Sequence, residues 1–182
     1  MFEIKTIGRG GQGAVTFSQL LAISAFEDGY PVVQAMPKFG VERRGAPAES
    51  FTRISKDECT GLRSLIYKPD IVVVLDSTLV KDVDICCGLK KDGLLIINTN
   101  KSSSNIGIKG FKIVTVDASS VALKHFGSDI VNTAMLGAFA SATNLVSLDS
   151  LFKAIDQKFQ GNSNLIDINK KAVKEVFEQC QN

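Results

Sequence analysis

Apolar and polar residues alternate over Phe2 to Ile7, as they do in a strand with one buried face. In the next segment, Ala14 to Asp28, the apolar residues recur at helical spacing, and Gly29 is placed to end that helix. Two further strands are expected over Pro31 to Ala35 and over Glu49 to Ile54. The first part of the chain is therefore predicted to run strand, helix, strand, strand.

A continuous β-branched run from Ile71 to Leu75 is typical of a parallel strand that is buried on both faces. Leu94 to Ile97 repeats this pattern, after a helix that is expected near Leu79 to Leu89. A weaker strand, Lys112 to Val116, ends at Asp117, which is suited to cap a following helix. The middle of the chain thus alternates strands with helices.

The last part of the chain is predicted to be helical over Asn132 to Leu145, Leu148 to Phe159 and Asn164 to Cys180. Strands that alternate with helices favour an α/β fold. We expect a single Rossmann-like domain over residues 1–182, with a mostly parallel twisted sheet and helices on both faces. A length of 182 residues suits one domain with one core.

Charge and hydropathy narrow the function classes. The net charge is only +2 and the basic residues are scattered, so no nucleic-acid partner is expected. The longest apolar run, Ile71 to Leu75, is far shorter than the roughly 20 residues that span a bilayer, so no membrane partner is expected. Glu3 and Lys5 interrupt the first apolar stretch, which argues against a signal peptide and for a cytoplasmic protein.

Side chains that commonly carry catalysis are sparse. The only histidine, His125, is expected to be a cap or a surface residue, and Asp70 and Asp76 are expected to be turn or helix caps beside a buried strand. We therefore predict no catalytic residue in this chain. The cysteines form no C-x-x-C pair, so no metal site is predicted and the thiols are expected to be reduced. They are Cys59, Cys86, Cys87 and Cys180.

A glycine-rich segment follows the first predicted strand and matches G-x-G-x-x-G. Such a turn lets the backbone approach a ligand, and the next helix offers free N–H groups to a phosphate or carboxylate. A dinucleotide site usually adds an acidic residue after the second strand, but that strand ends in Gln34-Ala35-Met36-Pro37. Another anionic ligand, or a tight turn without a ligand, remains open. The candidate residues are Gly8, Gly10, Gly11, Gln12 and Gly13.

A second unusual segment, FGVERRGAPAESFTRI, begins at Phe39. Glycines and prolines surround Arg43 and Arg44, so we predict a shaped loop that is neither helix nor strand. Guanidinium groups bind carboxylates and phosphates with forked geometry. The paired arginines are therefore candidates for contact with an anionic ligand or with a partner protein.

Taken together, Gly8 to Val15 and Phe39 to Pro47 resemble the gamma subunit of pyruvate (2-oxoacid):ferredoxin oxidoreductase. The resemblance spans residues 3 to about 178, and one departure is Lys38, where relatives often carry an acid. The Glu-Arg-Arg-Gly-Ala-Pro form is similar to pyruvate and branched-chain members, so pyruvate is the favoured substrate, with 2-oxoisovalerate or 2-oxoglutarate as alternatives. Further matching residues are Arg53-Ile54, Pro69-Asp70, Asp76, Asn132 to Ala138, and Asn169.

This resemblance implies a chain that carries no cofactor and has no activity alone. The complex would use thiamine diphosphate, Mg²⁺ and iron–sulfur clusters on its other subunits, and coenzyme A as co-substrate. Its partners would be alpha, beta and delta-type subunits, and ferredoxin or flavodoxin through the complex. A stand-alone nucleotide-binding enzyme and a scaffold module are the competing classes, and an isolated copy could form a homodimer through its exposed docking surface.

The resemblance leaves the role of the arginine segment open. It could contact a partner subunit, with Met36, Phe39, Glu42, Arg43 and Arg44 as interface residues. It could form a coenzyme A groove together with the glycine segment. Alternatively, its arginines could bond internal carboxylates such as Glu42 or Glu49. We expect the two segments to lie side by side near the carboxyl ends of the strands, where open α/β sheets bind ligands.

Overall fold

The computed structural model describes residues 1–38, 45–57, 62 and 64–181. A six-stranded sheet forms its centre, in the order β2-β3-β1-β4-β5-β6. The first strand of the chain is therefore an interior strand, with β3 on one side and β4 on the other. The strands are β1 (Phe2–Arg9), β2 (Val32–Pro37), β3 (Pro47–Ser55), β4 (Ile71–Val74), β5 (Leu94–Asn98) and β6 (Lys112–Val116).

Four neighbouring strands, β1, β4, β5 and β6, run parallel. Strand β3 is antiparallel to β1, and β2 is antiparallel to β3. The predicted mostly parallel α/β sheet is confirmed, with an antiparallel hairpin added at one side. Because β3 runs opposite to β1, β3 begins beside the carboxyl end of β1. The end of β2 and the start of β3 therefore lie on the side of the sheet where the parallel strands β1, β4, β5 and β6 end.

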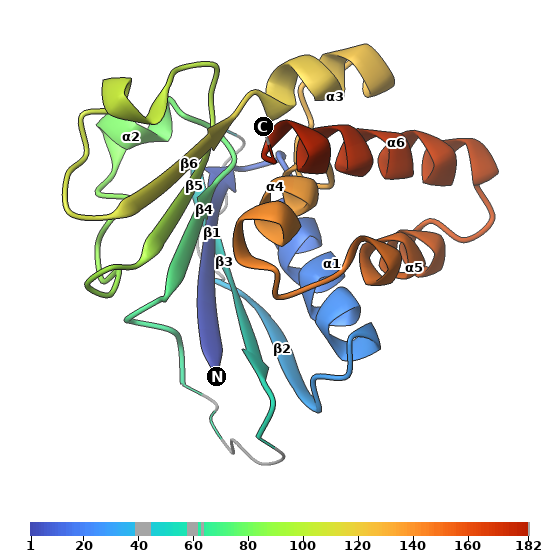
Figure 1. The fold of residues 1–182 in the computed structure, drawn as a ribbon, viewed down its shortest axis with the longest axis horizontal. Coiled ribbons are helices and arrows are strands. Elements are labelled where there is room, and N and C mark those ends of the chain that lie inside the picture. The colour runs from blue at the N-terminus through green and yellow to red at the C-terminus, as the bar shows by residue number, and fades with distance from the viewer. Residues whose placement is uncertain (39–44, 58–61, 63, 182) are drawn as a thin grey trace.

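Figure 1 shows most of the helices stacked on one face of the sheet and α2 on the other. Helices on both faces are thus observed, although the two faces are covered very unequally. The helices are α1 (Ala14–Glu27), α2 (Leu79–Asp82), α3 (Ala118–Phe126), α4 (Ala134–Thr143), α5 (Leu148–Lys158) and α6 (Ser163–Gln179), and a 3-10 turn, η1, spans Ser103–Asn105.

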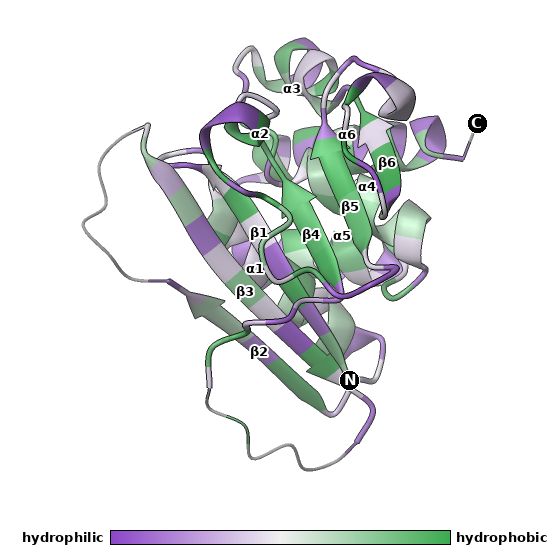
Figure 2. Cartoon of the chain, turned by 90° about the vertical axis from the view of Figure 1, so that its left-hand side faces the viewer, coloured by the Kyte–Doolittle hydropathy of each residue, from purple (hydrophilic) through white to green (hydrophobic). Residues whose placement is uncertain are grey.

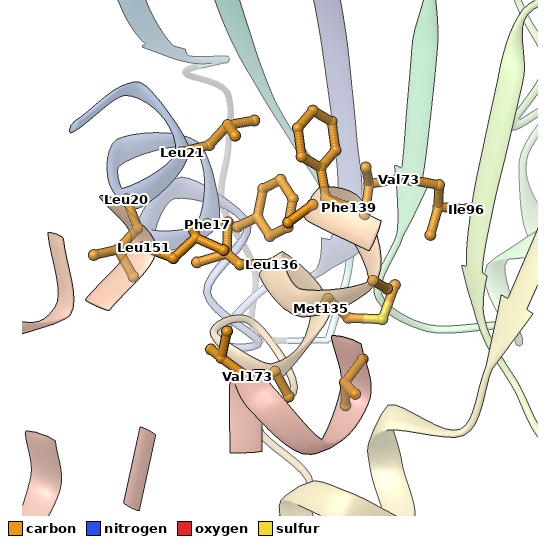
Figure 3. Close-up of a cluster of buried hydrophobic side chains, with 14 of the residues drawn as sticks. Phe17, Leu20, Leu21, Val73, Ile96, Met135, Leu136, Phe139, Leu151 and Val173 are labelled. Carbon is orange, nitrogen blue, oxygen red and sulfur yellow. The ribbon is translucent and has the colours of Figure 1, made fainter. Parts of the chain in front are cut away.

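The main core lies between the sheet and the larger helical layer. Helix α4 is buried from Ala134 through Ala140, and Phe139 meets Phe17 of α1 edge to face, with ring centroids 6.2 Å apart. Figure 3 shows these two rings between side chains from the sheet and from the other helices. A Cβ on Gly137 would lie 2.1 Å from the carbonyl oxygen of Val173, so this glycine allows α4 and α6 to pack closely.

A smaller core covers the opposite face of β4 and β5. Val72, Val74 and Leu95 pack there under Leu79, Ile85 and their neighbours. Figure 2 views this face and shows the green strands β4 and β5 beside the purple bands of β1 and β3. This smaller core therefore extends from β1 across β4 and β5 to Ile113 of β6.

Arginine 53 on β3 lies on the same face and is only 1% exposed. Its guanidinium donates to Glu3 Oε1 at 2.8 Å and to Gln34 Oε1 at 2.8 Å. It also donates to the carbonyl oxygens of Leu62 and Ser64. Its buried charge is thus paired and hydrogen-bonded, and it holds Leu62 and Ser64 against this face of the sheet.

Two local predictions were wrong. The helix expected near Leu79 to Leu89 is only the four-residue α2. Turns replace its second half, because Asp84 accepts the N–H of Cys86 and Gly88 has φ +79 where it passes the Tyr67 carbonyl.

The predicted loop was also too long, because Pro37 ends the edge strand β2 and Pro47 opens β3. Both are positions where a strand tolerates proline. Within the described ranges, no helix combines the length and the apolar character needed to cross a bilayer.

Candidate functional site

The glycine segment forms the predicted turn between β1 and α1. Gly11 and Gly13 have φ values of +98° and +81°, which favour glycine. Gly13 is the N-cap of α1, and that helix begins without a side-chain cap hydrogen bond. Gly11 is exposed, so the turn presents backbone at the surface beside the amino end of a long helix.

Gln12 points back into the protein. Its Nε2 donates to Asp76 Oδ2 at 3.0 Å, and its Oε1 accepts the backbone N–H of Arg9 at 2.7 Å. Asp76 lies two residues after the end of β4, and both of its oxygens are engaged because Thr78 donates to Oδ1 from its N–H and its hydroxyl. Gln12 therefore fixes the turn, and its role as a ligand contact stays a prediction.

Hydrogen bonds hold the pKa of Asp76 below its usual value. Burial acts in the opposite direction, but it is outweighed by the two bonds from Thr78, the bond from Gln12 and the charge of Arg9. This carboxylate therefore stays ionised as an anchor for the glycine turn. The prediction that Asp76 serves as a turn cap agrees with its contacts to Thr78.

The carboxyl end of the arginine loop, which we define as residues 38–46, lies against the glycine turn. The N–H of Gly10 donates to the carbonyl of Ala46 at 2.8 Å, and the N–H of Gly45 donates to the carbonyl of Gly10 at 3.2 Å. The predicted juxtaposition of the two segments thus holds for Gly45 and Ala46. The proposed contact residues Phe39, Glu42, Arg43 and Arg44 lie outside the described residues.

Arg9 connects the glycine turn and the end of the arginine loop to a third segment, which follows β4 and contains Thr78 and Asp82. Its Nη1 donates to the carbonyl of Gly45 at 3.2 Å, and its Nη2 donates to Thr78 Oγ1 and to Asp82 Oδ2, each at 2.6 Å. Its Nε lies 3.2 Å from Asp76 Oδ2. Sequence reasoning missed this role, because the partners of Arg9 depend on which strands lie beside β1.

Met36 was expected in the loop but belongs to β2, where it is half-buried and stands opposite Phe51 of β3. Cross-strand partners share a face, so Met36 lies on the α2 face of the sheet. Its assignment to the loop was therefore wrong. Its assignment as an interface residue stays a prediction.

Glu49, near the start of β3, forms ion pairs with two lysines. Its Oε1 lies 2.7 Å from Lys5 Nζ, and its Oε2 lies 2.5 Å from Lys38 Nζ. Burial raises the pKa of Glu49, but the hydrogen bonds from Lys38 and Lys5 outweigh it and lower the pKa overall. Lys38, the residue that departs from the family pattern, thus has an internal partner, and both oxygens of Glu49 are engaged without the arginine pair.

A polar crevice of about 420 Å³ opens beside Gln12, over the carboxyl ends of β4 and β5. Asp76, Asp117 and Asp129 are among its walls, and no lysine or arginine is among the described lining residues. Carboxylates repel phosphate groups, so this side of the glycine turn is unsuited to an anionic ligand. Neutral polar side chains such as Asn98 complete the lining.

The amino end of α4 contacts the other side of the glycine turn. A Cβ on Gly13 would lie 2.1 Å from Asn132 Nδ2. Asn132 Oδ1 accepts the N–H of Thr133, whose hydroxyl donates to Asn169 of α6 at 2.5 Å. These residues, which carry part of the family resemblance, therefore connect the turn to the helical layer.

The remaining candidates lie apart from this site. His125 sits in the last turn of α3, and its Nε2 is 2.7 Å from Glu175 Oε2, so it links α3 to α6. Asp70 accepts the N–H of Glu3 and pairs with Lys90, as expected of a structural carboxylate. In the described part of the chain, no three His, Cys, Asp or Glu side chains are arranged to hold a metal ion.

The family of the chain can now be stated. A model of the pyruvate ferredoxin/flavodoxin oxidoreductase family matches residues 3–179. The chain belongs to this family. Its fold and its glycine turn agree with the resemblance inferred from the sequence, and it is a gamma-type subunit of a 2-oxoacid:ferredoxin oxidoreductase.

Named relatives span nearly the whole chain. A pyruvate synthase subunit PorC from Methanothermobacter marburgensis is 50% identical, over 100% of this chain and 98% of its own length. A pyruvate/ketoisovalerate oxidoreductases common subunit gamma from Pyrococcus abyssi is 48% identical over the same shares. Among solved structures, pyruvate oxidoreductase subunit PORC from Thermotoga maritima has a TM-score of 0.83 and 40% identity, covering 97% of this chain and 95% of that chain.

A more distant structure shows the fold in a larger protein. The 2-oxoglutarate:ferredoxin oxidoreductase from Magnetococcus marinus matches with a TM-score of 0.75 and 19% identity. The match covers 99% of this chain but only 31% of that chain. The gamma fold therefore occurs there as one part of a longer polypeptide.

Proposed function

We propose that this gamma subunit supports the oxidative decarboxylation of pyruvate to an acyl-CoA by presenting the glycine turn and the arginine loop as one docking face for a partner subunit. The chemistry would use thiamine diphosphate and iron–sulfur clusters on the other subunits, with ferredoxin or flavodoxin as electron acceptor. The chain itself would act through contact, and it would work in the cytoplasm.

The observation that carries this proposal is the pair of backbone hydrogen bonds between Gly10 and residues 45–46. They attach the end of the arginine loop to the glycine turn. Arg43 and Arg44 directly precede that attachment in the chain. Arginine is favoured at protein interfaces because its guanidinium can bind partner carboxylates while its stem packs against apolar groups.

Coenzyme A contact is the second candidate role for the same face. Free backbone N–H groups at the start of α1 favour a phosphate, and Arg43 and Arg44 would supply positive charge. The acidic crevice beside Gln12 opposes this role on the β4 side. Any phosphate would therefore have to bind on the side of the arginine loop, so we favour a partner subunit as the main contact.

Pyruvate is proposed as the substrate because the relatives share it in their names. The Pyrococcus abyssi relative is named as common to pyruvate and ketoisovalerate oxidoreductases. A gamma subunit that serves two such enzymes cannot by itself set their substrate preference. We therefore propose that partner subunits choose between pyruvate and 2-oxoisovalerate.

The test replaces Arg43 and Arg44 by alanine together. The matched control replaces Lys109 and Lys171, which are exposed and have no ion pair among the described residues. The control should keep the melting temperature of the isolated chain, because exposed substitutions cost little stability, and the melting temperature of the arginine variant would be measured beside it. Only the arginine variant should lose incorporation into the complex, by about tenfold or more in apparent affinity.

The two roles predict different results in the assembled enzyme. Normal assembly with a raised KM for coenzyme A and an unchanged KM for pyruvate would favour the coenzyme A role. Weakened assembly with unchanged KM values at saturating subunit would favour docking. Normal assembly together with normal kinetics would contradict both roles.

A further inference from the structure

We infer that Arg9 is a positioning residue that holds Gly45 and Ala46, the carboxyl end of the arginine loop, against the glycine turn, an inference that rests on the docking role proposed above. Arg9 ends β1, between the start of β3 and the connection from β4 to α2. From there its side chain reaches Gly45 on one side and Thr78 and Asp82 on the other. One side chain thus ties together three segments that are far apart in the sequence.

The hydrogen bonds of Arg9 distinguish it from an arginine that binds a ligand. Each of its three guanidinium nitrogens already has an internal partner: Nη1 bonds the Gly45 carbonyl, Nη2 bonds Thr78 and Asp82, and Nε lies beside Asp76 and Thr78. Of the five N–H donors of this guanidinium, four are directed at internal acceptors and one, on Nη1, has no acceptor among the described residues, which is too few for forked binding of a phosphate or a partner carboxylate. Arg9 therefore acts through the residues that it holds.

The contact with Gly45 gives Arg9 its effect on the loop. Gly45 and Ala46 are also held by the two backbone hydrogen bonds to Gly10. The segment is therefore fixed at its backbone and clamped from the side by a guanidinium. Gly45 has φ +83 and no side chain to pack, so these hydrogen bonds are the contacts through which it is held.

Stability is a secondary effect of this cluster. The Arg9 side chain is 28% exposed and that of Asp82 is 49% exposed, and ion pairs with such exposure add little to folding. The fixed fork of the guanidinium, in contrast, can hold several acceptors at set angles, which the single nitrogen of lysine cannot do. The forked shape of the Arg9 guanidinium therefore matters more than its charge for holding Gly45, Thr78 and Asp82 together.

The experiment compares Arg9→Gln and Arg9→Lys with Lys109→Gln, a control at the opposite end of the sheet, before β6. Hydrogen exchange of the full chain would be measured at the amides of Gly10 and Gly45. Both Arg9 variants should exchange there about fivefold faster or more, while core amides of β4 keep their rates. Both should also lower incorporation into the complex about fivefold, and the control should change neither quantity.

The exchange and assembly results together decide whether Arg9 is a positioning residue. Unchanged exchange at Gly10 and Gly45, or full rescue by Arg9→Lys, would overturn the positioning role. Faster exchange with normal assembly would also overturn it, provided that the Arg43 and Arg44 double variant still weakens assembly. If that double variant also assembles normally, the docking role itself has failed, so the two failures can be told apart.

Discussion

Gly13 faces the side-chain amide of Asn132 so closely that a Cβ at this position would lie 2.1 Å from Nδ2 and 2.9 Å from Cγ. The glycine turn and the amino end of α4 are therefore fitted to each other without room for a methyl group. Gly11, two residues earlier, has a similar positive φ but open space around it. This pair allows backbone strain and steric fit to be measured separately.

Gly13→Ala should destabilise the chain by about 2–4 kcal/mol, since it adds left-handed strain and displaces the Asn132 amide from the N–H of Thr133. Gly11→Ala should cost only the strain, about 1–2 kcal/mol. Urea unfolding of the two variants would measure the difference. Equal losses would mean that the contact with Asn132 adds nothing to the role of Gly13.

The low pKa of Asp76 predicts a dependence of stability on acid. A carboxyl whose folded pKa lies below its unfolded value contributes stability that is fully present above the unfolded pKa, about 3.9 for Asp. That contribution is lost as pH falls through the folded pKa. The free energy of unfolding of wild type should therefore exceed that of Asp76→Asn near neutral pH.

The gap between wild type and Asp76→Asn should close as the pH is lowered from about 4 towards 2. A suitable control is Asp167→Asn on α6, because Asp167 is exposed and has no ion pair or hydrogen bond among the described residues. The control should show no comparable gap at any pH. A gap for Asp76→Asn that stayed constant over this range would argue against an ionised anchor.

Thr6 offers a test of buried polarity. Its Oγ1 is buried without a hydrogen-bond partner among the described residues. Ser50, directly opposite on β3, donates to the carbonyl of Ala14 at 2.7 Å and meets Ser18 Oγ at 2.6 Å. Thr6→Val should thus leave stability unchanged or raise it by up to about 1 kcal/mol, whereas Ser50→Ala should lower it by about 1–2 kcal/mol.

Thermal and urea unfolding of the two variants would check this contrast. Because valine has nearly the shape of threonine, packing should change little at Thr6. A loss for Thr6→Val as large as that for Ser50→Ala would mean that the Thr6 hydroxyl finds a partner in solution.

The local sequence correctly predicted helices and strands that have a regular spacing of apolar residues or a recognisable capping residue. The β-branched run at Ile71 became β4, and Asp117 caps α3 by accepting the N–H of Ser120. The three last helices were placed within two residues at each end. These segments carry their own signal because burial or a capping bond is decided by nearby residues.

Long-range partners could not be predicted in the same way. The sequence from Leu79 to Leu89 has helical spacing of apolar residues, but Gly88 has φ +79, which does not fit a helix, and it lies against the distant Tyr67 carbonyl, where a Cβ would not fit. The hydrogen bond of Gln12 to Asp76 was not predicted, because nothing in the local sequence shows that Asp76 will lie beside it. The Arg9 cluster likewise depends on strand order, which brings β3 and β4 to opposite sides of β1.

The central place of β1 has a consequence for biosynthesis. Strand β1 is made before the other strands of the sheet, and its parallel neighbour β4 ends only at Val74. Until β4 has been made, the apolar residues of β1 lack their neighbours on that side. The chain must also close the long loop between β1 and β4 before these two strands can pair, which slows folding. Nascent chains halted before residue 70 should therefore be held by chaperones, and release should begin once β4 has emerged.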